Sequence, residues 1–379
     1  MRTVLVVDRF DPLGGGLERW TARLAAHLLE AGHAVEVVTF AVGEHGLPVR
    51  VHQLPFARSV LARGRLIERC LAGLRPAVVH DTGSGWSGDV FHPQTGSHLG
   101  SLDREIASHP PLRRLKAAVS PRTNLRRWRL RRLEALQAAR ARRVVAVSHR
   151  IRRDLAARHG LSEERIAVIH NGADTARFAP ERIGGLREAA RRELGLAEGG
   201  VLFLGAAHNL RLKGMDTAMR ALAALRAAGA EAHLAIAGGA ADAHWTGLAA
   251  ELGVADRVRF LGQVDEMAPL FAAADAFVHP TRWDACSLST IEAAAAALPV
   301  ITTAMNGAAE LIRDGETGFV LSDPEDAGAL AARMRLLLDG AARRRIGAAA
   351  HLAAQGHDIR DNLRAVESLL FEAAQPATP

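Results

Sequence analysis

The chain has 379 residues, of which 49% are hydrophobic and 23% charged, and its formal net charge is +7. This is the composition of a folded chain with an ample core, and the length predicts two domains. Two cysteines, Cys70 and Cys286, exclude a disulfide framework, so we expect a reducing cytoplasm. Apolar runs fall short of the roughly 18 residues that cross a bilayer, and residues 1–10 predict a strand and not a signal peptide.

The positive charge is concentrated in residues 109–143, which hold eleven Arg, one Lys and a single acid, Glu134. That segment carries +11, which leaves −4 for the rest of the chain. Only two of the 48 basic residues are lysines, Lys116 and Lys213, so each lysine is a candidate for a specific role.

The chain opens with a predicted strand at residues 3–8, a glycine-rich turn at residues 14–16 and a helix at residues 17–31. A second strand follows at residues 34–39. The glycines lack the G-x-G-x-x-G spacing of a dinucleotide fingerprint. They either make a tight turn or let a ligand approach the backbone beside a helix N-terminus.

Two further short strands end in histidines, at His80 and at His92, and His98 follows in a loop. A single histidine is more often structural than catalytic. However, the carboxyl ends of parallel strands form the ligand-binding edge of a sheet, which raises His80 and His92 above His98 as candidates.

Residues 109–143 combine the basic residues with apolar residues at helical spacing, namely Leu112, Leu115, Val119, Leu125, Trp128, Leu133 and Leu136. Such a stretch lies on an anionic membrane surface, holds an anionic acceptor, or is a solvated helix packed through its leucines. Because aromatic interleaving and recognised binding modules are missing from the sequence, we expect no nucleic-acid partner.

Turn residues and a shift in composition predict a domain boundary near residue 175. The alternation of strand and helix then restarts, with strands predicted at residues 201–205, 232–237, 258–261 and 276–279. We therefore predict an α/β chain of two doubly wound domains, residues 1–175 and 176–357, with a closing helix at about residues 358–375.

The stretch 279–321 combines a strand end, a polar loop, a helix that opens near residues 287–289 and a strand at residues 299–303. Asp284 lies in the loop and Glu292 in the first turns of the helix. They are either an acid/base pair for glycoside hydrolysis or acceptors of hydrogen bonds from a sugar. The amides of the helix N-terminus there attract phosphate.

Lys213 and Arg211 follow the strand at residues 201–205 and precede a helix predicted to begin at Lys213. They are either solvated cations at a helix start or cations that stabilise a departing diphosphate. The sequence has no Asp-x-Asp pair, no His/Cys cluster with metal spacing and no phosphate loop of the G-x-x-x-x-G-K-[ST] type. We therefore expect no metal cofactor.

These motifs together resemble retaining glycosyltransferase family 4, whose GT-B architecture has two Rossmann-like, doubly wound domains facing across a cleft. The resemblance covers nearly the whole chain and rests on acid-x7-acid at 284–292, Ala297-Leu298-Pro299-Val300, Asn306-Gly307, Gly14–Gly16, Asn171-Gly172-Ala173-Asp174 and Lys213-Gly214. Residues 208–214 and 284–293 are most similar to the lipopolysaccharide-core glucosyltransferase-like branch.

The resemblance implies a role for each matching residue. Glu292 would hold the donor ribose, Asp284 would contact the transferred sugar, and Arg211 and Lys213 would hold the diphosphate. His92 matches the histidine that faces the sugar. The other donor-binding positions are Gly15, Gly16, Val264, Cys286, Ser287, Leu288 and Ser289. The C-terminal helix would cross back to complete the first domain.

The sequence also departs from the family pattern. Asp284 stands where Glu is more common, so its reach is one methylene shorter. Ser287 and Leu288 replace a usual Gly, and the residues before Lys213 leave the assignment of the arginine to 211 open. The short spacing between the histidines leaves open which of them faces the sugar.

The resulting expectation is a retaining, metal-independent transferase that uses a nucleoside diphosphate sugar, with UDP-hexose favoured. Its acceptor would be a saccharide or a lipid-linked molecule in cell-envelope polysaccharide or lipopolysaccharide synthesis. It would act in the cytoplasm, or peripherally on the inner face of the plasma membrane if the basic segment binds lipid. The alternatives are a sugar-nucleotide epimerase or hydrolase of the same architecture, and a non-catalytic sugar- or membrane-binding protein.

Overall fold

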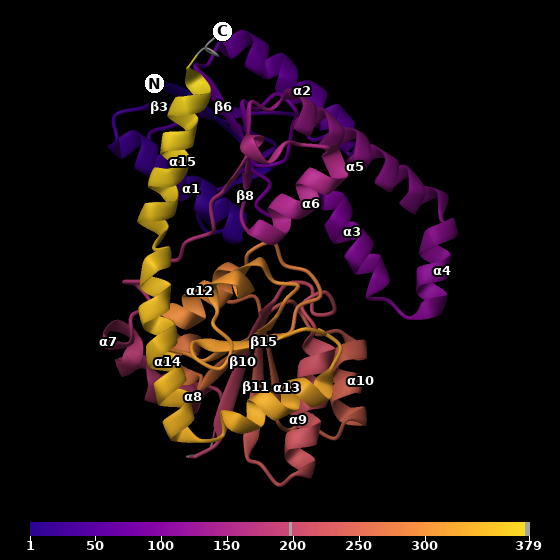
Figure 1. Ribbon diagram of the computed structural model, residues 1–379, viewed down its shortest axis with the longest axis vertical. Helices are drawn as coiled ribbons and strands as arrows, with labels where there is room; N and C mark the ends of the chain where they lie inside the picture. The colour runs from indigo at the N-terminus through magenta and orange to yellow at the C-terminus, as the bar shows by residue number, and fades with distance from the viewer. Residues whose placement is uncertain (197–198, 376–379) are drawn as a thin grey trace. The chain divides into compact units, whose positions relative to one another are not determined.

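The computed structural model describes residues 1–196 and 199–375, and the chain divides into two compact units (Figure 1). Unit 1 comprises Met1–His170 together with Asp361–Pro379, and unit 2 comprises Asn171–Arg360. The boundaries expected from the sequence, after residues 175 and 357, lie five and three residues from these.

Unit 1 is built on a seven-stranded parallel sheet with the strand order β5-β3-β1-β6-β7-β8-β9. The strand order reverses between β1 and β6, which makes the carboxyl ends of these two strands the switch point where doubly wound sheets bind ligands. The strands are β1 (Arg2–Val6), β3 (Ala34–Thr39), β5 (Arg50–Gln53), β6 (Val78–Asp81), β7 (Val90–Phe91), β8 (Arg143–Ala146) and β9 (Ile166–Val168), beside a short pair of β2 (Arg9–Phe10) and β4 (Ala41–Val42).

The helices of unit 1 are α1 (Gly16–Glu30), α2 (Val60–Leu74), α3 (His98–Ala107), α4 (Pro111–Val119), α5 (Pro121–Arg140), α6 (His149–His159) and the short η1 (Glu163–Arg165). The C-terminal helix α15 (Ile359–Ala374) joins them from Asp361 onward. It docks on α1 and the turn that follows it through polar contacts: Trp20 Nε1 donates to Asn362 Oδ1 at 2.8 Å, and the Glu367 carboxylate binds both His27 and His33.

Unit 2 is built on a six-stranded parallel sheet with the strand order β12-β11-β10-β13-β14-β15. Successive residues of its central strand β10 (Val201–Ala207) enter opposite cores, because Phe203 packs on one face of the sheet and Leu202 and Leu204 on the other. The other strands are β11 (Ala232–Gly238), β12 (Val258–Gly262), β13 (Ala276–His279), β14 (Val300–Thr303) and β15 (Gly318–Leu321).

Helices cover both faces of the unit 2 sheet (Figure 1). One core contains α9 (Met215–Ala227), α10 (Ala243–Glu251) and α13 (Ala327–Leu336). The other contains α7 (Pro180–Ile183), α8 (Arg187–Glu193), α11 (Ala268–Ala273), α12 (Leu288–Ala295) and the end of α14 (Gly340–Ala354). Short turns η2 (Gly184–Leu186), η3 (Gly307–Leu311) and η4 (Gln355–His357) complete the unit.

The structure corrects one helix start that matters for function. The helix predicted to begin at Lys213 begins at Met215, because Gly214 has a positive φ of 71° and ends the preceding loop. Lys213 therefore lies in the loop that follows β10 and not in a helix. Loop placement lets its side chain turn toward a neighbouring strand end.

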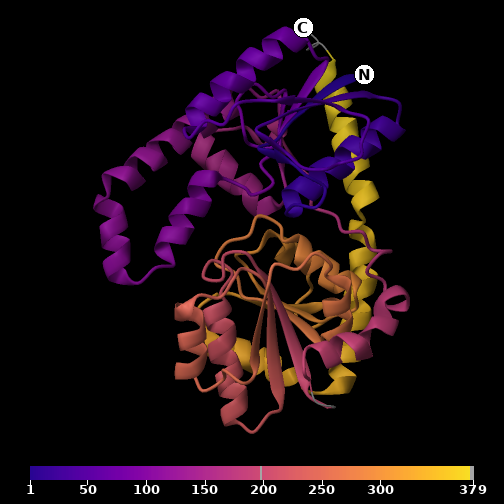
Figure 2. The same ribbon diagram turned by 180° about the vertical axis from the view of Figure 1, so that it is seen from behind.

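The basic segment forms α4 and α5, which extend away from the sheet of unit 1 (Figures 1 and 2). Every residue of α4 is at least partly exposed, and Leu112, Leu115 and Val119 are 62–69% exposed. Within the described ranges, none of the helices combines the length and apolarity needed to cross a bilayer.

The turn between α12 and β14 carries a strained residue, Ala297, whose φ of 56° lies in the left-handed region. That conformation destabilises the folded state by roughly 1–2 kcal/mol for a non-glycine residue. Glycine avoids this strain, but the greater entropy of its unfolded chain lowers the unfolding free energy by about 0.5–1 kcal/mol. We therefore expect Ala297→Gly to raise the unfolding free energy by about 0.5–1 kcal/mol in urea denaturation. Its neighbour Ala296, with φ −79°, is the matched control: Ala296→Gly should lower stability. Equal effects of the two changes would contradict the strain.

Candidate active site

Two of the predicted polar groups of unit 2, Lys213 and Asp284, meet at the carboxyl ends of β10 and β13, where the strand order of its sheet reverses. Residues 208–214 follow β10 and carry Lys213, and residues 280–287 follow β13 and carry Asp284. Seventy-one positions separate the two side chains along the chain. The parallel pairing of β10 with β13 brings the two loops side by side, at the switch point where such sheets bind ligands.

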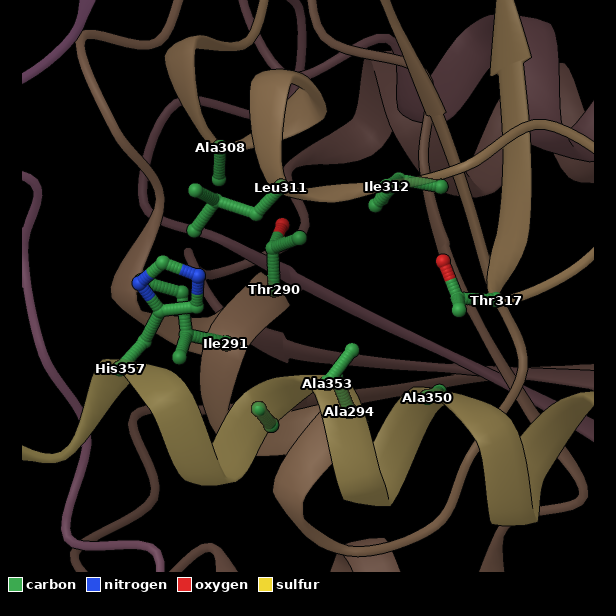
Figure 3. Close-up of a pocket in the computed structure, with 11 residues that line it drawn as sticks. Thr290, Ile291, Ala294, Ala308, Leu311, Ile312, Thr317, Ala350, Ala353 and His357 are labelled. Atoms are coloured by element: carbon green, nitrogen blue, oxygen red, sulfur yellow. The ribbon is translucent and has the colours of Figure 1, made fainter.

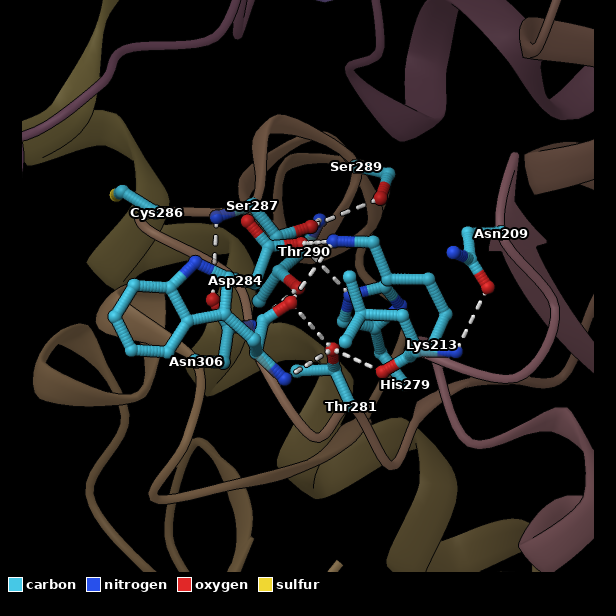
Figure 4. Close-up of polar contacts among 12 residues, drawn as sticks. Asn209, Lys213, His279, Thr281, Asp284, Cys286, Ser287, Ser289, Thr290 and Asn306 are labelled. Carbon is cyan, nitrogen blue, oxygen red and sulfur yellow. Dashed lines mark hydrogen bonds and ion pairs between the residues drawn. The ribbon is translucent and has the colours of Figure 1, made fainter. Parts of the chain in front are cut away.

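Asp284 is held by two donors at the centre of this site (Figure 4). Its Oδ2 accepts from Lys213 Nζ at 2.5 Å and from His279 Nε2 at 3.0 Å. Burial opposes ionisation of Asp284, but Lys213 and His279 outweigh it and hold the pKa of the carboxyl well below its usual range. Asp284 is therefore a carboxylate at neutral pH, suited to accept hydrogen bonds and unsuited to donate a proton to a glycosidic oxygen.

His279 is a site residue that the sequence analysis missed. It is 1% exposed at the end of β13 and stacks on Phe277. Burial lowers its pKa, so the ring is neutral, and the proton must lie on Nε2 because the carboxylate of Asp284 can only accept. His279 thereby gives the same carboxylate oxygen a second donor besides Lys213.

The start of α12 is organised by Asn306, a second residue that was missed in this role. Its Oδ1 accepts from the amides of Ser287 and Ala308, at 3.1 and 3.0 Å, and its Nδ2 donates to the hydroxyls of Thr290 and Thr302. Ser287 caps the helix by accepting from the Thr290 amide, which confirms the predicted helix start. The Ser287 amide already donates to Asn306, so an anion bound at this helix start would accept hydrogen bonds from neighbouring amides.

The other predicted residues of unit 2 are spread around this centre. Arg211 turns toward α10, where its guanidinium bonds His244 and lies over the Trp245 ring. Glu292 is half-buried on α12, and Val264 packs beside the core that contains α11. Cys286 is buried, with its carbonyl bonded by Asn171, while Leu288 and Ser289 are half-buried in the first turn of α12.

In unit 1, Gly15 caps α1 and Gly16 is its first residue. The space beside Gly15 is taken by the Glu18 carboxylate, since a Cβ there would lie 2.9 Å from Glu18 Oε2. The anion at this helix start is therefore the protein's own glutamate. The roles of both glycines toward a donor stay predictions.

His92 is buried with no exposed surface, and its Nδ1 lies 3.1 Å from His80 Nε2. Trp20 packs against both rings. Burial lowers the pKa of His80 to about 3 and that of His92 well below its usual range, so both rings are neutral. The two histidines thus form one buried pair, and the role of His92 toward a sugar stays a prediction.

A separate small pocket lies between α12 and α14 (Figure 3). Alanines and aliphatic side chains make most of its lining, with Thr290, Thr317 and His357 as the polar members. None of the residues predicted to bind the donor lines it, so this pocket is distinct from the site around Asp284.

Family models match both halves of the chain. The model described as Glycosyltransferase Family 4 matches residues 14–177, and the one described as Glycosyl transferases group 1 matches residues 198–340. Among curated relatives, the D-inositol 3-phosphate glycosyltransferase of Geodermatophilus obscurus is 32% identical over 88% of this chain and 81% of its own length. The enzyme of that name from Nocardia farcinica is 34% identical, over 62% of this chain and 54% of its own length.

Two further likenesses concern lipopolysaccharide and UDP-sugar proteins. The lipopolysaccharide glucosyltransferase WaaG of Escherichia coli is 33% identical over 42% of this chain and 43% of its own length. A crystal structure of WaaG matches 97% of this chain and 99% of its own with a TM-score of 0.78 at 23% identity. HepE from Anabaena, solved with UDP and glucose, matches 98% and 99% with a TM-score of 0.74 at 20% identity. At these identities the structural matches show the fold.

The two loops of the site touch at Gly214, and this contact can be tested. A Cβ on Gly214 would lie 2.0 Å from the Pro280 carbonyl oxygen, in addition to the strain of its positive φ. Gly229 has a similar φ of 76° with open space around it. We expect Gly229→Ala to cost about 1–2 kcal/mol from strain alone, and Gly214→Ala clearly more, in urea denaturation. Equal losses would contradict a tight contact between the loops.

Proposed function

The chain belongs to glycosyltransferase family 4, with the GT-B fold of two Rossmann-like domains, and on that premise we propose that it transfers a hexose-type sugar from a nucleoside diphosphate sugar. The donor we propose is a UDP-hexose, in keeping with HepE, which has been solved with UDP-glucose. The acceptor we propose is a saccharide or lipid-linked molecule of cell-envelope polysaccharide or lipopolysaccharide synthesis. We propose that transfer retains the anomeric configuration and needs no metal.

The observation that carries this proposal is the placement of Lys213 beside Asp284 at the switch point of unit 2. A cation there meets a diphosphate where a doubly wound sheet binds nucleotides. A constitutively ionised carboxylate next to it accepts hydrogen bonds from sugar hydroxyls. Both charges are largely buried, with 21% and 16% of their side chains exposed, which strengthens their action on a ligand.

In the proposed mechanism, Lys213 turns part of its hydrogen bonding from Asp284 to the diphosphate. The bond between the anomeric carbon and the diphosphate oxygen breaks, and the negative charge that develops on that oxygen is stabilised by the ammonium. An acceptor hydroxyl forms the new glycosidic bond on the same face of the sugar, and its proton passes to the departing diphosphate. His279 keeps Asp284 in place during this exchange.

The first test combines donor binding with transfer. A thermal-shift screen of UDP, GDP and ADP sugars should show a rise in melting temperature with a UDP-hexose, because a bound ligand stabilises the folded state. With that donor, Lys213→Ala should lower kcat by roughly 10²–10³-fold, as expected for loss of one preorganised charge. Lys116, an exposed lysine of unit 1, gives the matched control: with a soluble saccharide acceptor, for which no membrane surface is needed, Lys116→Ala should leave kcat unchanged.

Other outcomes separate the alternatives. A changed sugar nucleotide formed without acceptor would identify an epimerase, and donor binding with no transfer to any acceptor would identify a sugar-binding protein. Loss of all transfer in a chelator would reject the metal-free mechanism. Full turnover by Lys213→Ala would remove the lysine from the mechanism.

We further propose that α4 and the first half of α5 bind an anionic membrane surface, which would bring the enzyme to a lipid-linked acceptor. Leu125 and Trp128, in the first half of α5, are likewise exposed, at 46% and 54%. Arginines flank the apolar residues of both helices in the sequence. Apolar residues that enter the headgroup layer and basic residues that meet anionic lipid are the two parts of an interfacial helix.

The second half of α5 is anchored in unit 1. From Leu130 onward the helix has buried residues, and Glu134 accepts hydrogen bonds from the Ser97 hydroxyl and the Leu99 amide. Gln137 donates to the carbonyls of Gly83 and Gly85. The exposed half therefore extends from a fixed base.

Vesicle sedimentation tests the membrane surface. The protein should bind anionic vesicles at low salt and lose most binding at high salt, because each basic residue near the surface contributes about 1 kcal/mol that salt screens. A triple change of Leu112, Leu115 and Val119 to Ser should weaken binding without changing the melting temperature. The control is Leu336→Ser with Leu352→Ser, two exposed leucines of unit 2. Equal binding by the triple variant and the control would contradict the proposed surface.

A further inference from the structure

Arg282 is a buried charge that none of the roles above uses. It lies in the loop after β13, two residues before Asp284, and 9% of its side chain is exposed. Its guanidinium forms a two-pronged pair with Asp216, with Nη1 to Oδ1 at 2.8 Å and Nη2 to Oδ2 at 3.0 Å. Asp216 lies in the first turn of α9, directly after the loop that carries Lys213. The pair therefore spans the two loops of the site.

Further contacts of Arg282 hold the backbone of the lysine loop itself. Its Nη1 also donates to the carbonyl oxygen of Arg211, and its amide donates to the carbonyl oxygen of Leu212 at 2.8 Å. The Thr281 hydroxyl donates to the same Leu212 oxygen. Thus the two residues that precede Lys213 are both bonded to the loop that carries Asp284.

The side chain of Lys213 completes the connection between the loops. Its Nζ donates to the Trp283 carbonyl at 3.3 Å as well as to Asp284. On the other side of the junction, Gly214 lies against the Pro280 carbonyl so closely that no side chain fits between them. The position of the ammonium is therefore set by backbone contacts on both sides of Lys213.

The charge of Arg282 is balanced inside the protein. Burial works against its charged form, but Asp216, together with the more exposed Glu325 that pairs with Arg282 Nε, outweighs burial and raises its pKa. Asp216 is also paired with Arg220, whose side chain is 49% exposed and lies on the outer side of α9. Arg282 and Arg220 thus bind the same carboxylate, but Arg220 lies on α9 itself, whereas Arg282 lies in the loop of Asp284 and bonds the loop of Lys213.

We propose that Arg282, through its buried pair with Asp216, is a positioning residue that sets the place of the Lys213 ammonium relative to Asp284. It touches neither substrate nor reacting atoms; it acts through the lysine. The inference rests on the proposed function, because the charge that Lys213 is placed to meet is the diphosphate of the donor. Misplacing a preorganised group by about 1 Å costs up to roughly 10²-fold in rate.

The test replaces the pair by apolar residues of similar size, as Asp216→Leu with Arg282→Met, because removing both buried charges is far less damaging than removing one. We expect a melting temperature within a few degrees of the parent, a kcat lowered by roughly 10–100-fold and little change in the KM of the donor. Arg220→Met is the matched control and should change neither. Arg282→Lys, which keeps the charge but not the two-pronged geometry, should fall between parent and double variant.

A double-mutant cycle shows whether Arg282 acts through Lys213. In the parent, Lys213→Ala is expected to lower kcat by roughly 10²–10³-fold, and in the Asp216→Leu/Arg282→Met background it should lower kcat much less, because the lysine is already misplaced. Effects that multiply fully, or an unchanged kcat in the folded double variant, would overturn the proposal.

A readout independent of turnover separates this inference from the proposed function. Because Lys213 and Lys116 are the chain's only lysines, the acylation rate of each amine can be followed by mass spectrometry, with exposed Lys116 as internal reference. The rate at Lys213 relative to Lys116 should be low in the parent and in Arg220→Met, and rise several-fold in the double variant. An unchanged ratio would overturn the positioning role even if transfer is found. A raised ratio in a protein without transferase activity would reject the proposed function alone.

Discussion

The ion pair between Lys213 and Asp284 is the interaction on which the site depends. Taking a pair of charges out of water is unfavourable. Their mutual attraction offsets that cost only when their geometry is fixed and their remaining hydrogen bonds are made. Here both conditions are met by the fold, because the pairing of β10 with β13 places the two loops together and His279 supplies a second donor to the carboxylate. The same low exposure that makes the pair costly makes each charge effective toward a bound ligand.

The central strands were predictable because each is a short apolar run bounded by turn residues. The elements that were missed carry weaker signals. β5 has the sequence RVHQ at the edge of its sheet, where only partial burial is required, and α14 contains Gly347, a residue that disfavours helix in the sequence. That glycine is required by packing, since a Cβ there would lie 2.1 Å from the Ala297 carbonyl oxygen. Such contacts between distant segments leave no periodic pattern.

The sequence predicted which edge of the sheet carries the candidate site, but not the contacts that build it. Strand ends and polar residues indicated that Lys213 and Asp284 lie on the same edge, and the structure brings them into contact. The residues that support them were not predicted, because the partners lie far apart in sequence: Arg282 and Asp216 are separated by 66 positions. The direction of the Arg211 side chain was not predicted, for a different reason. A long side chain can reach several neighbours, and here the ring of Trp245 and the imidazole of His244 attract it toward α10.

In the basic segment, ion pairs with the rest of unit 1 neutralise part of the positive charge that the sequence carries. The sequence assigns +11 to residues 109–143 as a whole, yet arginines near the end of the segment are paired with acids of unit 1, as Arg140 is with Glu68 and Arg142 with Asp89. Pairing at the base leaves the excess charge concentrated on α4 and the exposed start of α5, next to the exposed leucines. The one acidic residue of the segment, Glu134, lies inside the protein and anchors α5 by accepting a hydrogen bond from the Leu99 amide. In the proposed membrane interaction, this positive charge is the part that meets anionic lipid, while the exposed leucines enter the headgroup layer.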